Sequence, residues 1–160
     1  MKWGVVVFPG SNDDRDTIYA LGSVLGQETV ALWHGDKYLA GAEAVVLPGG
    51  FSYGDYLRPG ALARFSPIMT AVADFARSGG AVLGICNGFQ VLCEAGLLPG
   101  ALVRNQQIRF RCSVEQVSVE RTDTAFSSLL APGGSLAIPI KHGEGRYVAD
   151  EATLGEIEDG

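Results

Sequence analysis

The residue in this sequence best placed for nucleophilic chemistry is a cysteine at the bend between a predicted strand and a predicted helix. Residues 84–88 read Gly-Ile-Cys-Asn-Gly, a G-x-C-x-G stretch with sulfur in place of the oxygen of the nucleophile elbow G-x-S-x-G. Such a turn strains its central residue, and small neighbours leave room for the turn and for a substrate. Most free cysteines are buried and inert. The joint occurrence of strand, elbow and helix favours a nucleophilic role for Cys86.

Two backbone amides are candidate donors to an oxyanion that forms beside Cys86. The N–H of Asn87 lies at the N-terminus of the predicted helix, where the helix dipole also stabilises a thiolate. The second donor is Gly50 in a glycine-rich loop, residues 47–63, since a glycine brings a bare N–H close to a substrate carbonyl. An ordinary Pro-Gly turn is the alternative for this loop. A nucleotide-phosphate loop is rejected, because the Walker lysine and the G-x-G-x-x-G spacing are missing.

A thiol nucleophile needs a histidine as its base and an acid to orient that histidine. The sequence contains two histidines. His34 follows a predicted strand, where a lone histidine is more often a surface or supporting residue. His142 lies two residues before Glu144, which makes this pair the more attractive of the two.

The other two cysteines, Cys93 and Cys112, are interpreted as structural. Cys93 lies two helical turns after Cys86, on the same face of the predicted helix, and Cys112 lies in a predicted strand. Three cysteines without a C-x-x-C pair argue against a disulfide framework or a structural zinc site. We therefore expect no metal site and a reducing compartment.

The elements that position these residues alternate between strand and helix. Strands are predicted at residues 3–8, 29–33, 44–47 and 81–85, with those at 3–8 and 81–85 buried, and helices after a cap at Ser11, Asn12 or Asp13 and at residues 67–78 and 87–95. This alternation predicts an α/β fold: a flavodoxin-like open sheet, mostly parallel, with helices on both faces. Ligands bind beyond the carboxyl ends of such strands, where residues 9–14, residues 48–55 and the turn at Cys86 would lie.

The second half of the chain has a different pattern. Residues 108–120 alternate with period two, as in a half-exposed strand, and residues 136–140 and 145–149 predict two more short strands. We expect an added antiparallel or mixed region here. By length, residues 1–160 form a single domain.

Composition excludes several function classes. Hydrophobic residues make up 47% and charged residues 19% of the chain, which is typical of a globular protein, and the net charge is −6. That charge argues against nucleic-acid or anionic-membrane partners. No apolar stretch approaches the ~18 residues of a membrane span, and the N-terminus has no cleavage pattern of a signal peptide. We expect a cytoplasmic location.

Four segments together resemble one enzyme family. FPGSNDDRD, LPGGFSYGDYLRPGALA, GICNGFQVLCEAGLLPGAL and IPIKHGEGRY are similar to the glutaminase subunit of phosphoribosylformylglycinamidine synthase. This subunit is a class I, triad-type glutamine amidotransferase of purine biosynthesis. The resemblance extends over nearly the whole chain, and GGFSYGDYLRPGA and HGEGRY separate this family from other triad amidotransferases. Asp13 is a departure, because the family often has cysteine there.

The resemblance implies a role for each matched residue. Cys86 would attack the side-chain amide carbon of glutamine, expel ammonia and form a glutamyl thioester that water then hydrolyses. Gly50 and Asn87 would donate the oxyanion N–H groups. The residues that the resemblance implies for glutamine binding are Gly49, Gly50, Phe51 and Gln90.

The resemblance also implies partners. Ammonia would pass to a large synthetase subunit that uses ATP and magnesium to convert formylglycinamide ribonucleotide to its amidine, and a small third subunit often completes the assembly. The glutaminase subunit itself would need no cofactor. In this family the segment around His142 is a conformational or interface loop, and the triad histidine and glutamate come later, in a PHPE-like motif. We therefore expect residues 1–160 to lack the C-terminal portion of the domain, with the base of Cys86 beyond Gly160.

Two other function classes remain open at this level. A flavodoxin-like cysteine hydrolase or chaperone of the DJ-1 type commonly has histidine directly after the cysteine, whereas this chain has Asn87. A catalytically incomplete binding subunit on the same scaffold is the second. Five arginines flank the predicted site and could together meet an acidic partner surface: Arg58, Arg64, Arg104, Arg109 and Arg111.

Overall fold

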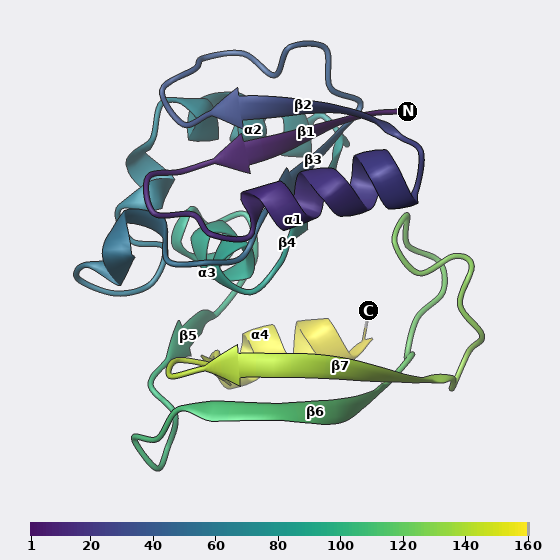
Figure 1. The fold of residues 1–160 in the computed structure, drawn as a ribbon. Coiled ribbons are helices and arrows are strands. Elements are labelled where there is room, and N and C mark those ends of the chain that lie inside the picture. Colours follow the sequence, from purple (N-terminus) through teal and green to yellow (C-terminus); the bar gives the residue numbers. More distant parts are fainter. Residues whose placement is uncertain (160) are drawn as a thin grey trace. The chain divides into compact units, whose positions relative to one another are not determined.

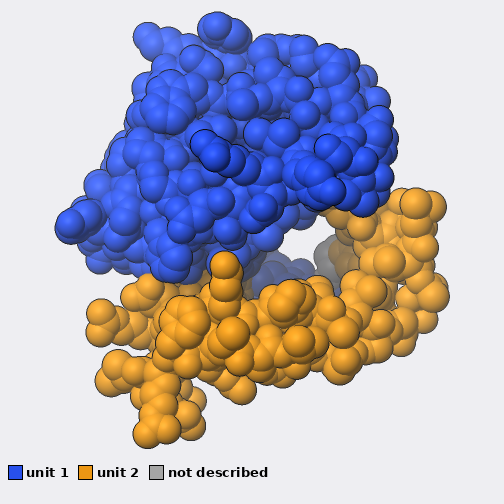
Figure 2. All heavy atoms as spheres, viewed as in Figure 1, with its two compact units in different colours: residues 1–101, 148–160 blue, residues 102–147 orange. Residues whose placement is uncertain are grey.

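The computed structural model describes residues 1–159, and the chain divides into two compact units (Figures 1 and 2). Unit 1 consists of Met1–Ala101 and Val148–Gly160, and unit 2 consists of Leu102–Tyr147. The cysteine elbow and the glycine-rich loop both belong to unit 1.

Unit 1 contains a four-stranded parallel sheet. Its strands are β1 (Lys2–Val7), β2 (Glu28–Trp33), β3 (Ala44–Leu47) and β4 (Ala81–Gly84), in the order β2-β1-β3-β4. This is the strand order of a flavodoxin-like sheet, and it confirms the predicted fold class. The order reverses between β1 and β3, and the carboxyl ends of strands at such a switch point are where ligands bind in open α/β sheets.

Helices cover both faces of this sheet, as the alternating apolar side chains require. They are α1 (Asp14–Tyr19), continued by a π-helical turn η1 (Ala20–Val24), then α2 (Ile68–Arg77) and α3 (Asn87–Glu94). Val6 and Val45 pack in one core cluster with Ile68 of α2 and Val91 of α3. Their neighbours Val5 and Val46 point to the opposite face and pack with Leu21 of η1. Figure 1 shows α1 in front of the sheet and α2 behind it.

Two local predictions for unit 1 need correction. Asp13 precedes α1, but no side chain caps this helix; the carbonyl of Asp13 instead accepts bonds from the N–H and the hydroxyl of Thr17. The carboxylate of Asp13 is turned toward Gly49, which removes it from the capping position. Strand β4 is also only half-buried along its length, because it lies at the edge of the sheet among the described strands.

The second half of the chain contains the expected antiparallel strands. Strand β6 (Arg111–Ser118) pairs with β7 (Ser135–His142), and β5 (Ala101–Val103) pairs with β8 (Arg146–Val148). Helix α4 (Glu151–Asp159) follows. The prediction that Cys112 is structural is wrong, because it is exposed, and Val114 on the same face is 65% exposed. The physical reason is that a two-stranded ribbon has no second layer of its own to bury an apolar face.

Candidate active site

Cys86 lies on a strained elbow between β4 and α3. Its backbone angles are φ 51° and ψ −108°, a conformation that L-residues rarely adopt and that costs on the order of 1–3 kcal/mol. This confirms the predicted strain of the G-x-C-x-G turn. The thiol is exposed, and the following helix directs its N-terminal dipole toward this turn.

The two glycines of the elbow are required by close packing. A Cβ on Gly88 would lie 1.9 Å from the carbonyl oxygen of Leu47, so the first turn of α3 contacts the end of β3 directly. A Cβ on Gly84 would lie 2.6 Å from Leu92 Cδ1 and 2.8 Å from the backbone of Gly88. The elbow therefore tolerates no larger residue at either position without a shift of the main chain.

The glycine-rich loop brings the ends of β1 and β3 against the elbow. A Cβ on Gly49 would lie 2.5 Å from Asp13 Oδ2 and 3.4 Å from Cys86 Cβ, so Gly49 separates these two side chains. Gly50 has φ +123° and forms an isolated bridge with Ser11, and a Cβ there would meet the backbone N of Asn12 at 2.5 Å. Gly49 thus stands beside Cys86, whereas Gly50 packs against Asn12 and adopts a backbone conformation that favours glycine.

The side chain of Asn87 links the glycine-rich loop to the elbow. Asn87 is 2% exposed, and its Oδ1 accepts bonds from the N–H of Ser52 at 3.1 Å and from the Ser52 hydroxyl at 2.6 Å. Its Nδ2 donates to Asp55 Oδ1 and to Gln90 Oε1, both at 3.0 Å. The sequence indicated only the backbone N–H of Asn87. The polar loop residues Ser52 and Asp55 were the signal in the sequence from which hydrogen-bond partners of the Asn87 side chain could have been predicted.

The remaining two predicted substrate ligands differ in exposure. Phe51 is 50% exposed, beside the short helix η2 (Ser52–Asp55). Gln90 is half-buried on the first turn of α3, with its Oε1 bound to Asn87.

As the first residue of α3, Asn87 has a backbone N–H outside the intrahelical hydrogen-bond ladder, as an oxyanion donor requires. The structure thus brings Cys86 together with Gly49, Asn87 and Gln90, and their roles in catalysis stay predictions.

The loop that follows Phe51 contains a run of residues with left-handed backbone angles. Tyr53, Asp55 and Leu57 have φ of 54°, 54° and 71°, and Gly54 between them has φ 67°. Of these residues, only the glycine is of a type that predicts a left-handed conformation from the sequence. Tyr56 and Leu57 are 74% and 85% exposed at its tip. The hydrogen bond that Asn87 Nδ2 donates to Asp55 Oδ1 helps to hold the loop in this strained conformation.

His34, the histidine in the same unit as Cys86, is engaged elsewhere. Its Nδ1 lies 2.8 Å from the hydroxyl of Tyr53, which is also 2.8 Å from the hydroxyl of buried Ser66. The ring of Trp33 packs against it edge-on, with 4.5 Å between the centroids. This supports the interpretation of His34 as a supporting residue. His142 belongs to unit 2, where its Nδ1 lies 2.9 Å from Asn105 Oδ1.

The five arginines divide between the two units. In unit 1, Arg58 forms a two-pronged ion pair with Glu94 at the end of α3, and Arg64 donates to the carbonyl of Glu94 at 3.0 Å. The hydrogen bond and the charge of Glu94 raise the pKa of Arg58. Arg104, Arg109 and Arg111 belong to unit 2. Recognition of an acidic partner by these residues stays a prediction.

Cys93 is the one cysteine whose prediction as a core residue is confirmed. It is buried on α3, and burial, together with the neighbouring Glu94 carboxylate, raises the pKa of its thiol. All three cysteines are free thiols. Among residues 1–159, no three His, Cys, Asp or Glu side chains gather as metal ligands would, and no helix has the length and apolarity needed to cross a bilayer.

Comparison with known proteins identifies a glutamine amidotransferase family over the whole chain. Residues 1–160 match the CobB/CobQ-like glutamine amidotransferase domain. The phosphoribosylformylglycinamidine synthase subunit PurQ of Moorella thermoacetica is 61% identical over 158 residues, which are 99% of this chain and 67% of that relative. The subunit of the same name from Rubrobacter xylanophilus is 58% identical over 159 residues, 99% of this chain and 72% of the relative.

A solved structure agrees with these relatives. The structure of PurLQS from Thermotoga maritima matches with a TM-score of 0.88 and 47% identity, over 94% of this chain and 70% of that one. This likeness includes both the parallel sheet and the antiparallel region, given the share of the chain that it covers.

Proposed function

This chain belongs to the CobB/CobQ-like glutamine amidotransferase domain family, and we propose that it is the glutaminase subunit of a phosphoribosylformylglycinamidine synthase. It hydrolyses glutamine to glutamate and ammonia for a purine-biosynthetic synthetase. The observation that carries this proposal is the strained elbow, which exposes the Cys86 thiol directly beside Gly49 and the start of α3.

The geometry supports one sequence of steps at Cys86. The thiolate attacks the amide carbon of glutamine, and the carbonyl electrons move onto oxygen to form a tetrahedral oxyanion. The N–H groups of Gly50 and Asn87 are proposed to receive this charge, because preorganised backbone donors stabilise developing charge without reorganisation. Collapse of the intermediate expels ammonia, which leaves with the proton that a base removed from the thiol. Water then hydrolyses the thioester to glutamate.

Partners follow from the relatives. PurLQS contains a synthetase subunit and a small third subunit in addition to PurQ, and this chain is the corresponding subunit of such an assembly. We propose that ATP and magnesium act in the synthetase partner, where they activate the amide oxygen of formylglycinamide ribonucleotide. This subunit would bind glutamine without a cofactor of its own. A cytoplasmic location is supported by its free thiols.

Two alternative functions have weaker support. A hydrolase or chaperone of the DJ-1 type commonly has histidine directly after the nucleophile. Here that residue is Asn87, whose side chain is hydrogen-bonded to Ser52, Asp55 and Gln90. A binding subunit without catalysis has no need for an exposed thiol on a strained elbow. The family match favours the amidotransferase over both.

Covalent trapping tests the proposed nucleophile. A glutamine analogue with an electrophilic carbon should alkylate Cys86 in the full chain, and excess glutamine should block this reaction, as read from the mass of the labelled peptides. Cys112 is an internal control, since it is also exposed but lies in the other unit. Equal labelling of both cysteines, with no protection by glutamine, would contradict the proposal.

Assays of the complex test the partner. With the synthetase subunits present, Cys86→Ala should abolish glutamine-dependent synthesis and leave ammonia-dependent synthesis intact. Unchanged glutamine-dependent synthesis would reject Cys86 as the nucleophile, whereas loss of both activities would indicate a failure of assembly.

A further inference from the structure

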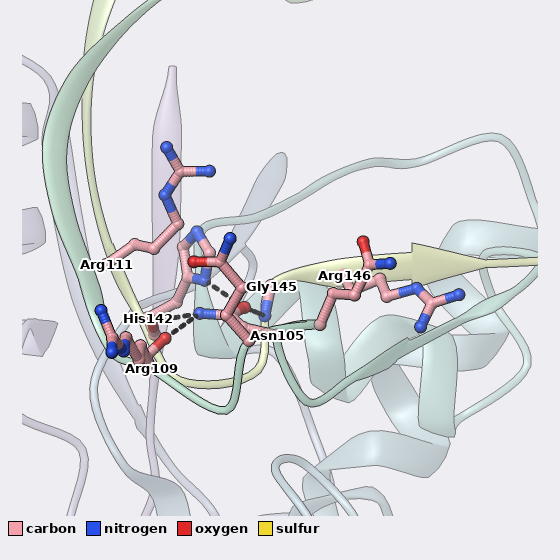
Figure 3. A pocket seen from close by; sticks show the side chains of 8 residues that line it. Asn105, Arg109, Arg111, His142, Gly145 and Arg146 are labelled. Atoms are coloured by element: carbon pink, nitrogen blue, oxygen red, sulfur yellow. Dashed lines mark hydrogen bonds between the residues drawn. The ribbon is translucent and has the colours of Figure 1, made fainter.

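A second site lies in unit 2, which contains none of the residues used in the proposed glutaminase reaction. It is a pocket of about 420 Å³. Its lining includes Asn105, Arg109, Arg111, His142, Gly145 and Arg146 (Figure 3). All of these residues belong to the segment Leu102–Tyr147. We propose that this pocket binds the phosphoryl group of a small molecule.

The pocket is built around a fully bonded asparagine. Asn105 is 8% exposed, and its Nδ2 donates to the carbonyls of Arg109 at 2.7 Å and His142 at 2.9 Å. Its Oδ1 accepts from the backbone N–H of Gly145 at 3.0 Å. These bonds connect two separate chain segments, residues 105–109 and 142–145, so the side chains that line the pocket project from a fixed frame.

The same asparagine determines the tautomer of His142. Because the Nδ2 of Asn105 faces two carbonyl oxygens, the amide orientation is assigned by its partners, and Oδ1 is the atom that meets His142 Nδ1 at 2.9 Å. His142 Nδ1 must then carry the hydrogen. The Nε2 of His142 is left as the ring nitrogen for a ligand, and a protonated phosphate oxygen can donate a hydrogen bond to it.

The charge of this unit is opposite to that of the whole chain. The chain has a net charge of −6, yet residues 102–147 contain six basic and four acidic side chains. Three guanidinium groups line the pocket and no carboxylate does. Among the described residues, no carboxylate lies within ion-pair distance of Arg109 or Arg146, and Arg111 has only Glu115 at 3.8 Å. The pocket therefore concentrates uncompensated positive charge.

The arrangement of the arginines favours a phosphoryl group. Arg111 is the first residue of β6 and Arg109 lies two residues before it, and Figure 3 shows their side chains on the same side of Asn105, with Arg146 on the other. Guanidinium forks match the geometry of phosphate oxygens, and a dianion can engage more than one fork. The volume lies in the range of small-molecule pockets, about 300–1,000 Å³, which favours a small ligand over an acidic protein segment.

Calorimetric titration of the full chain tests this site. The probes are inorganic phosphate, diphosphate and ribose 5-phosphate, at ~0.15 M ionic strength so that diffuse attraction is screened. We expect saturable binding of at least one phosphate probe, and Arg109→Gln should weaken it at least about tenfold, the usual loss for a charged hydrogen bond. The substitution leaves the carbonyl of residue 109 in place for Asn105.

Arg121→Gln is the matched control, because it removes the same charge from the same unit, at an arginine paired with Asp123 outside the pocket. It should change the affinity less than twofold. Preference for ribose 5-phosphate over the inorganic ions would identify a phosphate ester as the ligand, and the reverse would identify free phosphate or diphosphate. The proposal is overturned by equal losses in both variants, by no saturable binding, or by tighter binding of a glutamate-rich peptide than of any phosphate.

Discussion

Replacing Asn87 by alanine should separate the glycine-rich loop from the cysteine elbow. Asn87 is 2% exposed, and its amide binds the N–H and hydroxyl of Ser52, the carboxylate of Asp55 and the side-chain carbonyl of Gln90. These bonds connect the loop that contains Gly50 to the first turn of α3. The substitution removes all of them and leaves the elbow sequence otherwise intact.

The expected cost follows from what the alanine leaves unpaired. Ser52 is 3% exposed, so its N–H and its hydroxyl lose their acceptor inside the protein. An unsatisfied buried group costs about 1–3 kcal/mol, so the two groups together give a loss in unfolding free energy of about 2–6 kcal/mol. Ser52→Ala removes only the hydroxyl bond and should cost about 0.5–1.5 kcal/mol. Asn87→Asp keeps an acceptor for Ser52 but directs an oxygen at the carboxylate of Asp55.

Urea unfolding gives the stability of each variant, with an unchanged slope m as the sign that the folded states are comparable. Hydrogen exchange at the Ser52 amide gives the local effect, because its N–H donates to Asn87 Oδ1. The reasoning is refuted if Asn87→Ala stays within about 0.5 kcal/mol of the parent chain and its Ser52 amide remains as protected as before. It is also refuted if Ser52→Ala costs as much as Asn87→Ala.

Three further predictions concern packing, thiol reactivity and the base of Cys86. Gly88→Ala should destabilise the chain by about 1–3 kcal/mol, read from the urea midpoint, because its Cβ would meet the carbonyl oxygen of Leu47. Alkylation of Cys93 should be slow at neutral pH and rise only as the pH approaches its raised pKa, as followed by mass spectrometry of the labelled peptide. The 160-residue chain alone should show negligible glutaminase activity in an ammonia-release assay, because His34, the histidine in the same unit as Cys86, is bound to Tyr53, and His142 belongs to the other unit.

Each of these three predictions has a control and a result that would contradict it. Gly155→Ala on α4 is the control for the Gly88 variant, because a Cβ there meets nothing within 4 Å. This substitution should leave the unfolding free energy unchanged or raise it by up to about 1 kcal/mol. Equal effects of the two substitutions would contradict the packing argument. Labelling of Cys93 at neutral pH as fast as that of exposed Cys112 would contradict the effect of burial. Turnover by the isolated chain that His34→Gln abolishes would make His34 the base.

The fold class and the nucleophile were predictable because both depend on local patterns. The apolar run that became β3 is buried along its whole length and the one that became β1 is buried at residues 4–6, and a continuous apolar run is what a strand covered on both faces requires. The turn at Cys86 was predictable from its flanking glycines, and the close contacts at Gly84 and Gly88 give the reason. The exposure of Cys112 was not predictable, because period-two alternation does not indicate whether a second layer of structure covers the strand.

The sequence by itself therefore determined the alternation of strands and helices, the elbow that strains Cys86, and the family to which the residues belong. Only the tertiary structure decided which side chains serve that elbow. Asn87 contacts Ser52 and Asp55 across more than 30 residues of chain, and Asn105 contacts His142 across 37, distances over which no local periodicity carries information. Such partners are set by how β-strands and loops pack in space, because a hydrogen bond requires atoms within about 3 Å, whatever their separation in sequence.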